Sequence, residues 1–321
     1  MNVLETIFVF VDRSNILHLL AKHLLLIVCM LISVGCTISK NQSTPLNLVD
    51  SIVVNTLESI KARGGSIAIR IDNSEIYSAT YGSGFSIEHP APLGSTSKPV
   101  TAYILMQMEI DGLVDINAPI GLYVPELKQV RNGVQISDKT LFEFMTHNAG
   151  IAAVQFGLAS SWQQNLSVAL AVGPAQGHVY ANENYALLTQ VVVNILGSYE
   201  EAIRKYINVG GITTFRSSSK FVDPSYLGAG GLEASATDYL RFMEKSAPTS
   251  VLQAGGFGIS WFHGESGYIY HQGMIVGGGR DQYALALWGA AAESGSTISL
   301  VFQANAFDTD ALLIQQLLGG L

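Results

Sequence analysis

The feature that most constrains the fold is a short polar segment, residues 94–99, joined directly to the apolar run 100–108. The run has the composition of a buried helix. Proline is tolerated only in the first helical turn, so Pro99 indicates where the helix begins, and Gly112 is a plausible C-terminal stop. The chain of 321 residues is long enough to bury such a helix in an ample core.

The same segment contains Ser-x-x-Lys, formed by Ser95 and Lys98. Residues three apart share a helix face, so the hydroxyl is expected beside the amine. A half-desolvated lysine at a helix N-terminus can have its pKa lowered enough to act as a base, and a serine needs such a neighbour to become a nucleophile. The alternative is that Ser95 is only an N-cap. The pair therefore indicates catalysis only if other parts of the chain agree.

Composition excludes several classes of function. The formal net charge is -8 and the sequence has no basic stripe with interleaved aromatics, so we expect no nucleic-acid partner. Both cysteines, Cys29 and Cys36, precede the body of the chain, which leaves no internal disulfide and no thiolate metal site there. The seven histidines form neither His-Glu-x-x-His nor His-x-His. We therefore expect neither a metal nor a cofactor.

Residues 1–36 have the pattern of a lipoprotein-type signal peptide. Lys22 and His23 precede the apolar segment 24–32, and the small residues that follow end at Cys36, the expected lipid attachment site. Residues 37–45 are predicted to be a linker. The alternative is an uncleaved membrane anchor. Both interpretations place the body outside the cytoplasm, in the periplasm or at the cell surface, with a membrane tether.

The pattern of the body, residues 46–321, predicts an α+β fold. Strands are expected near both ends, with helices and loops between them. We expect an antiparallel sheet built from both chain ends and flanked by helices, an α/β lobe of about 46–93 and 228–321, and an inserted, mostly helical lobe of about 94–227. The predicted strands are 66–71, 75–81, 258–262, 268–270, 283–288 and 298–302, and the predicted helices 46–62, 140–145, 185–196, 234–243 and 311–318.

Two further motifs follow the first in order. They are Tyr180-Ala181-Asn182 and His271-Gln272-Gly273. Together with Ser95-Thr96-Ser97-Lys98 they resemble the serine β-lactamase and penicillin-recognising D,D-peptidase superfamily, in its class C-like branch, which includes esterases. Residues 141–150, the segment 229–232 with Asp238, and residues 301–305 resemble further segments of that branch. The resemblance spans about residues 46–321 and implies a β-lactamase/transpeptidase-like sandwich of helices and sheet.

The resemblance implies a role for each motif residue. Ser95 would form an acyl-enzyme, Lys98 would accept its proton, and Tyr180 would share that proton work, its phenolate favoured by Lys98. The backbone N–H groups of Ser95 and Met274 would form the oxyanion hole. Asn182 would bind the substrate amide, while His271 and Gly273 would line the site. The substrate would be a small molecule or peptide with a reactive carbonyl, such as a peptidoglycan fragment.

Some motif residues have simpler interpretations. Tyr180 could be a packed aromatic, and Asn182 could cap the following helix. A Ser-His-Asp triad through His271 has little support because the chain has no Gly-x-Ser-x-Gly elbow.

The third motif also departs from the pattern of β-lactamases and D,D-peptidases, because His271 replaces their lysine. A neutral histidine holds a carboxylate less well. We expect an exported serine hydrolase of amides, esters or β-lactams, with weight on esters and peptides. The alternative is a catalytically idle cell-wall-binding module of the same fold.

Overall fold

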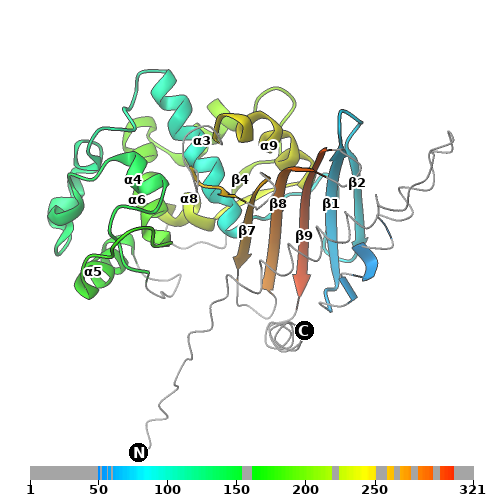
Figure 1. Cartoon of the computed structure of the whole chain (residues 1–321), viewed down its shortest axis with the longest axis horizontal. Coiled ribbons are helices and arrows are strands. Elements are labelled where there is room, and N and C mark those ends of the chain that lie inside the picture. The colour runs from blue at the N-terminus through cyan, green and yellow to red at the C-terminus, as the bar shows by residue number, and fades with distance from the viewer. Residues whose placement is uncertain are drawn as a thin grey trace, which may run out of the picture.

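The computed structural model describes residues 50, 53–55, 57–58, 61–153, 161–218, 224–250, 259–263, 268–275, 281–291 and 297–306. In this part of the chain a sheet lies beside a helical region, and the edge of the sheet on the side of the helices is formed by β7 (Ile269–Ile275) and the short β6 (Phe262–His263) (Figure 1). The predicted signal peptide 1–36 with Cys36, the linker 37–45 and the closing helix 311–318 lie outside the described residues, as does much of the predicted helix 46–62.

The sheet has six antiparallel strands in the order β2-β1-β9-β8-β7-β6. Two strands come from the beginning of the body and four from its end, so β1 pairs with β9 across most of the sequence. The predicted α+β fold, with one sheet built from both chain ends, is confirmed. The strands are β1 (Gly64–Ile71), β2 (Tyr77–Gly82), β6 (Phe262–His263), β7 (Ile269–Ile275), β8 (Asp281–Ala291) and β9 (Thr297–Ala306).

Side chains along each strand point alternately to the two faces of the sheet, and each face packs against its own hydrophobic cluster. In β1, Ile67 and Ile69 pack with Leu300 and Phe302 of β9 on one face. Ala68 points the other way, into the large cluster shared with the helices. A period of two places successive side chains on opposite faces, and here both faces are covered.

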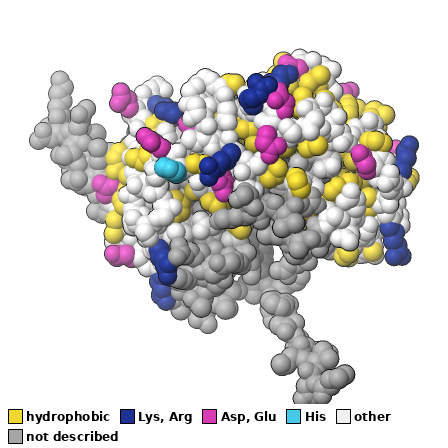
Figure 2. Space-filling model, turned by 180° about the vertical axis from the view of Figure 1, so that it is seen from behind, with side chains coloured by type: hydrophobic (Ala, Val, Ile, Leu, Met, Phe, Trp, Pro, Cys, Tyr) yellow, Lys and Arg dark blue, Asp and Glu magenta, His cyan; other side chains and the backbone are white. Residues whose placement is uncertain are grey.

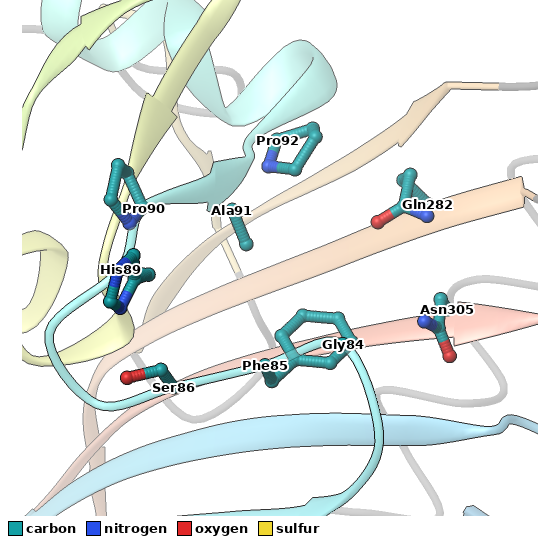
Figure 3. Close-up of a pocket in the computed structure, with 9 residues that line it drawn as sticks. All are labelled: Gly84, Phe85, Ser86, His89, Pro90, Ala91, Pro92, Gln282 and Asn305. Carbon is teal, nitrogen blue, oxygen red and sulfur yellow. The ribbon is translucent and has the colours of Figure 1, made fainter.

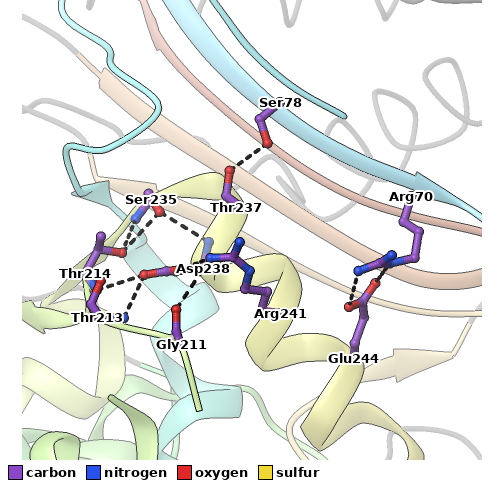
Figure 4. Close-up of polar contacts among 10 residues, drawn as sticks. All are labelled: Arg70, Ser78, Gly211, Thr213, Thr214, Ser235, Thr237, Asp238, Arg241 and Glu244. Atoms are coloured by element: carbon purple, nitrogen blue, oxygen red, sulfur yellow. Dashed lines mark hydrogen bonds and ion pairs between the residues drawn. The ribbon is translucent and has the colours of Figure 1, made fainter. Parts of the chain in front are cut away.

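Helix α9 (Ala236–Ser250) packs against the sheet and is held there by polar contacts as well as by its apolar face (Figure 4). The Thr237 and Ser78 hydroxyls share a hydrogen bond of 2.7 Å, and Glu244 pairs with Arg70 of β1. Asp238 accepts hydrogen bonds from the N–H groups of Thr213 and Thr214, each 2.9 Å long. These contacts tie the helix to both the sheet and the loop that contains Thr213 and Thr214.

The helical region surrounds two buried helices, α3 (Ser97–Ile110) and α6 (Asn182–Leu196). As predicted, α3 has Pro99 in its first turn and ends just before Gly112, whose φ is +72°. The other elements are η1 (Gly94–Thr96), η2 (Ile120–Leu122), η3 (Pro125–Gln129), η4 (Gly133–Ile136), α4 (Leu141–Met145), α5 (Trp162–Val172), α7 (Tyr199–Ala202), a π-helical turn η5 (Ile203–Ile207), η6 (Pro224–Tyr226) and α8 (Leu227–Gly230).

One local prediction was wrong and one element was missed. In the described part of the predicted strand 258–262, residues 259–262, only Phe262 belongs to a strand, β6, and Ser260 has a φ of +63° that no strand allows. The described residues also contain a second, three-stranded sheet in the order β3-β5-β4, which was not predicted. Its strands are β3 (Ala91–Pro92), β4 (Arg216–Ser217) and β5 (Leu232–Ala234), too short to show a period.

Candidate active site

Ser95 lies in η1 and Lys98 in the first turn of α3, which continues directly from it. The Lys98 Nζ donates a 3.0 Å hydrogen bond to Ser95 Oγ, so the predicted pair meets. The alternative role for Ser95 is wrong: the N-cap of α3 is Thr96, whose hydroxyl bonds the Leu93 carbonyl. Ser95 is half-buried, whereas Lys98 is fully buried. The hydroxyl is thus reachable from outside, with the amine beneath it.

The amine of Lys98 has two further acceptors, the Asn182 Oδ1 at 2.9 Å and the Ala229 carbonyl at 2.6 Å. Desolvation lowers the pKa of Lys98 to about 7, although attraction to Glu183 opposes the shift. An ammonium group can donate to all three acceptors. A neutral amine can donate to Asn182 and Ala229 and accept the Ser95 proton. Both charge states fit the same geometry, so the proton can move between Ser95 and Lys98 without rearrangement.

Tyr180 lies against the same amine, with Lys98 Nζ 4.8 Å from its ring centroid. Burial raises the pKa of Tyr180, and a hydrogen bond with Ser95 only partly opposes the shift. The expected phenolate is therefore wrong: desolvation favours the neutral phenol. Since the phenol bonds Ser95, it can still relay a proton, while Lys98 is the group beside Ser95 whose pKa lies near 7. The Tyr180 ring also packs against the tilted ring of His147, with centroids 4.4 Å apart, so Tyr180 is both a packed aromatic and a neighbour of Lys98.

Asn182 is the first residue of α6 and is exposed apart from its bond to Lys98. The predicted alternative, a helix cap, is wrong, because the N-cap position is Ala181 and no side chain caps this helix. The oxygen of the Asn182 amide instead accepts the hydrogen bond from Lys98, and the side chain faces outward. It is therefore placed between the buried amine and the outside of the protein.

Two glycines allow β7 to approach the loop that carries Ser95. A Cβ on Gly273 would lie 1.8 Å from the Leu93 carbonyl oxygen and 2.9 Å from Ser95 N. A Cβ on Gly94, whose φ is +53°, would lie 2.6 Å from Met274 N. The backbone around Ser95 and the backbone around Met274 are therefore in close contact. An oxyanion hole needs two N–H groups near the same carbonyl oxygen, and this contact brings the two predicted residues into the same region.

His271 is on β7 but its ring is buried between Tyr180 and Phe262, with centroid distances of 6.3 and 5.3 Å. Nδ1 lies 2.8 Å from the Gln272 carbonyl, and Nε2 has no hydrogen-bond partner among the described residues. Desolvation, together with the nearby Lys98, lowers the pKa of His271 to about 3. The imidazole is thus neutral at physiological pH and lies behind the site surface.

Three contributors were missed or undervalued in the sequence. The Ala229 carbonyl holds Lys98, and its only signal is the Gly-Gly-Leu segment that follows it. Glu183 is a buried carboxyl next to Asn182. His147 has a φ of +57°, and its Nδ1 accepts from the Ala181 N–H at 3.3 Å and lies 3.0 Å from the Asn184 amide. These contacts connect His147 to the segment in which α6 begins.

A hollow of about 430 Å³ lies beside the strand that leads to Ser95, between β3 and the loop before it on one side and β8 and β9 on the other (Figure 3). Its lining includes Phe85, His89, Gln282 and Asn305, and none of the three motifs contributes to it. The face shown in Figure 2 carries lysine and arginine side chains singly or in small groups among acidic and apolar ones. The described part of that face has no continuous basic surface.

Neither a metal centre nor a membrane span can be identified in the described ranges. No three His, Cys, Asp or Glu side chains in them are placed to share a metal ion. None of the helices there has both the length and the hydropathy needed to cross a bilayer.

The sequence matches the beta-lactamase family over residues 49–314. No curated protein matches it closely enough to be significant. Among solved structures, a class C beta-lactamase from Rhodobacter sphaeroides has a TM-score of 0.62 at 13% identity, with 85% of this chain and 98% of that chain covered.

Two other structures extend the range of similar proteins. A beta-lactamase/D-alanine carboxypeptidase from Yersinia pestis has a TM-score of 0.59 at 17% identity, covering 85% of this chain and 99% of that one. A D-stereospecific amidohydrolase from Streptomyces sp. has a TM-score of 0.57 at 18% identity, covering 77% and 90%. At these identities the similarity shows the shared fold.

Proposed function

This chain belongs to the beta-lactamase family, and we propose that it is a serine hydrolase that works through an acyl-enzyme on Ser95. The observation that carries the proposal is the bond between Ser95 Oγ and the amine of Lys98, which is buried and has a pKa of about 7. A serine becomes a nucleophile only when a neighbouring base takes its proton. Lys98 is neutral in a useful fraction of molecules at neutral pH, which is what that step needs.

In the proposed reaction, Ser95 Oγ attacks the substrate carbonyl carbon while its proton passes to Lys98 Nζ. The carbonyl oxygen becomes an oxyanion held by the N–H groups of Ser95 and Met274. The bond to the leaving group then breaks, and the leaving group takes a proton from Lys98, directly or through Tyr180. Water releases the acyl group by the same steps in reverse, leaving Ser95 and a carboxylic acid. Asn182 is proposed to orient the substrate amide.

The substrate is proposed to be an ester or amide without a carboxylate beside the scissile carbonyl. His271 occupies the position of the expected lysine, and burial keeps it neutral, so it offers no charge to an anionic group. Attraction between opposite charges at such a site is lost when one partner is uncharged. Peptidoglycan-derived peptides and β-lactams, which carry such a carboxylate, are expected to bind more weakly than uncharged esters and amides.

The proposed setting is the periplasm or cell surface. This rests on the sequence of residues 1–36 alone, with Cys36 as the proposed lipid-bearing residue. Globomycin treatment of cells producing the full chain would block processing at Cys36. A Cys36→Ser variant should leave the membrane fraction, and an unchanged distribution would contradict lipidation.

The substrate proposal is tested with matched pairs. The full chain is assayed on benzylpenicillin and its methyl ester, and on a nitrophenyl acyl ester, with Ser95→Ala as the control. We expect faster turnover of both uncharged compounds than of benzylpenicillin, and loss of turnover in Ser95→Ala. A preference for the carboxylate form would overturn the substrate class. Absence of turnover with every compound would favour the idle wall-binding module.

A further inference from the structure

Glu183 is a buried carboxyl group for which the proposed reaction has no role so far. It follows Asn182 in the first turn of α6, and only 1% of its surface is exposed. The N-terminus of a helix attracts a negative charge, and the N–H of Glu183 itself favours its ionised form. Burial of a carboxylate nevertheless costs several kcal/mol unless another charge compensates it. The placement therefore requires an explanation.

The hydrogen bonds of Glu183 satisfy only part of its carboxylate. Oε1 accepts a long bond of 3.4 Å from the Tyr226 hydroxyl, which itself accepts a 2.7 Å bond from the Asn165 amide. Oε2 is buried and has no hydrogen-bond partner among the described residues. Lys98 is in the complementary situation: its amine is fully buried and bonded to three neutral oxygens. The two residues are thus buried groups of opposite charge that attract each other.

Their titrations fall in the same range. Burial raises the pKa of Glu183 to about 7 and lowers that of Lys98 to about 7, and in each case attraction to the other group opposes the shift. The other titratable groups around the pair are Tyr226, beside Glu183, and four groups around Lys98. These four are Tyr180, Tyr185, His147 and His271. Burial raises the pKa of both tyrosines and lowers the pKa of both histidines. Near neutral pH, therefore, a charge on either Lys98 or Glu183 favours the charged form of the other.

We propose that Glu183 is a positioning residue that supplies the counter-charge for Lys98 when Lys98 takes the proton of Ser95. This inference rests on the proposed function. Proton transfer creates a cation on a fully buried amine, and no carboxylate among the described residues bonds that amine directly. An ionised Glu183 stabilises the cation at the moment it forms, which makes Lys98 a stronger base than burial alone would allow.

The test uses the full chain and a fluorophosphonate carrying a fluorophore, which needs no knowledge of the natural substrate. Labelling forms an Oγ–phosphorus bond on Ser95 and breaks the phosphorus–fluorine bond. Fluoride leaves with the electron pair, and the hydroxyl proton goes to Lys98. The second-order labelling rate is measured against pH for the native protein, Glu183→Gln, Glu183→Asp and Glu233→Gln. Glu233 is the matched control, a glutamate that is also buried but pairs with Arg216.

Without the carboxylate, Lys98 becomes a weaker base. In Glu183→Gln we expect the midpoint of the pH–rate curve to move to lower pH by on the order of one unit, and the plateau to fall. Glu183→Asp keeps the charge and should restore most of the native midpoint, and Glu233→Gln should not move it. A merely structural role would lower the rate at every pH and leave the midpoint in place, and that result would overturn the inference.

Tyr226→Phe serves as a second variant in case Glu183→Gln does not fold, which thermal melting will show. It removes the hydrogen bond that favours the Glu183 carboxylate, so the midpoint should move in the same direction by less. An unmoved midpoint in a folded Tyr226→Phe would count against the inference. If the native protein is labelled and Ser95→Ala is not, the proposed function stands, whatever the result with the Glu183 variants. Failure of the native protein to label on Ser95 would overturn both.

Discussion

At the scale of single residues, the proposed chemistry depends on the burial of one amine beside one half-buried hydroxyl. Lys98 has no exposed surface, and three hydrogen bonds fix its position, whereas Ser95 above it is half-buried. Lys98→Met keeps most of the side-chain volume and removes the base. Since a general base contributes roughly 10² to 10⁴ in rate, Ser95 labelling by the fluorophosphonate should slow by about that factor.

The matched control is Lys139→Met, at a partly exposed lysine that pairs with Glu143 far along the sequence from the motifs. It should label at the native rate. A loss of less than tenfold in Lys98→Met, with an unchanged thermal midpoint, would mean that Lys98 is not the base.

The pH dependence of acylation follows from the same residue. Lys98 accepts a proton only in its neutral form, and desolvation brings its pKa to about 7. The labelling rate should therefore rise with pH through about 7 and level off above it. The curve is measured by quenching the fluorophosphonate reaction at a series of times at each pH, with the ionic strength held constant. A rate that continues to climb to pH 10 would show a lysine with an ordinary pKa, or catalysis by Tyr180.

Much of the site could be predicted from the sequence because three motifs identify residues that meet in space. The Ser95–Lys98 pair required only helical spacing, and Asn182 and Tyr180 do reach the same amine. The Ala229 contact could not be predicted, since any residue can offer a backbone carbonyl. The charge state of Tyr180 was predicted wrongly because the cost of burying it depends on the surrounding packing.

At the scale of elements, the site depends on the close approach of η1 and β7. Gly273→Ala would place a methyl group 1.8 Å from the Leu93 carbonyl, so the strand must move away from Ser95. Overpacking of this kind typically costs about 1–3 kcal/mol. We expect a lower thermal midpoint and at least a tenfold slower labelling rate, because the Met274 N–H moves with the strand. Gln272→Ala, on the same strand, should affect neither, and equal behaviour of the two variants would contradict this account.

The anchoring of α9 gives a second prediction for an element. The Asp238 carboxylate is buried, and burial alone would raise its pKa. Hydrogen bonds from two backbone N–H groups and from Arg241 outweigh this effect and hold its pKa below the usual range. Asp238→Asn should destabilise the protein by about 1–3 kcal/mol in denaturant titration, because a buried acceptor for two donors is weakened. The exposed Asp138→Asn is the control. Equal stability of the two variants would contradict the anchoring role.

Elements with a clear period were predicted and the others were not. The β1 and β9 strands and the α3 and α6 helices combine length with a regular apolar pattern. The second sheet was missed since its strands have two or three residues, and its pairing of β3 with β5 joins segments more than 130 residues apart. Such contacts depend on tertiary packing rather than on local pattern.

At the scale of the whole molecule, stability should fall in acid partly because of His271. Its pKa is about 3 in the folded chain, against an ordinary value of 6.5 for a histidine in an unfolded one. Between these values the unfolded chain binds a proton that the folded chain excludes, so stability is lost as pH falls from 6.5 towards 3, by at most about 1.4 kcal/mol per pH unit. The denaturant concentration at the unfolding midpoint, measured across this pH range, should depend less on pH in His271→Gln than in the native protein. The exposed His89→Gln should keep the native slope, and equal slopes in all three proteins would contradict the assignment.

The most direct test of the central claim is rapid-quench intact-mass spectrometry of the full chain mixed with a nitrophenyl acyl ester, followed by peptide mapping. If Ser95 attacks the carbonyl, a single acyl adduct should form on the peptide that contains Ser95 and then decay as the product appears. Ser95→Ala should show no adduct. Ester turnover with no adduct at Ser95, or an equal adduct in Ser95→Ala, would contradict the acyl-enzyme mechanism.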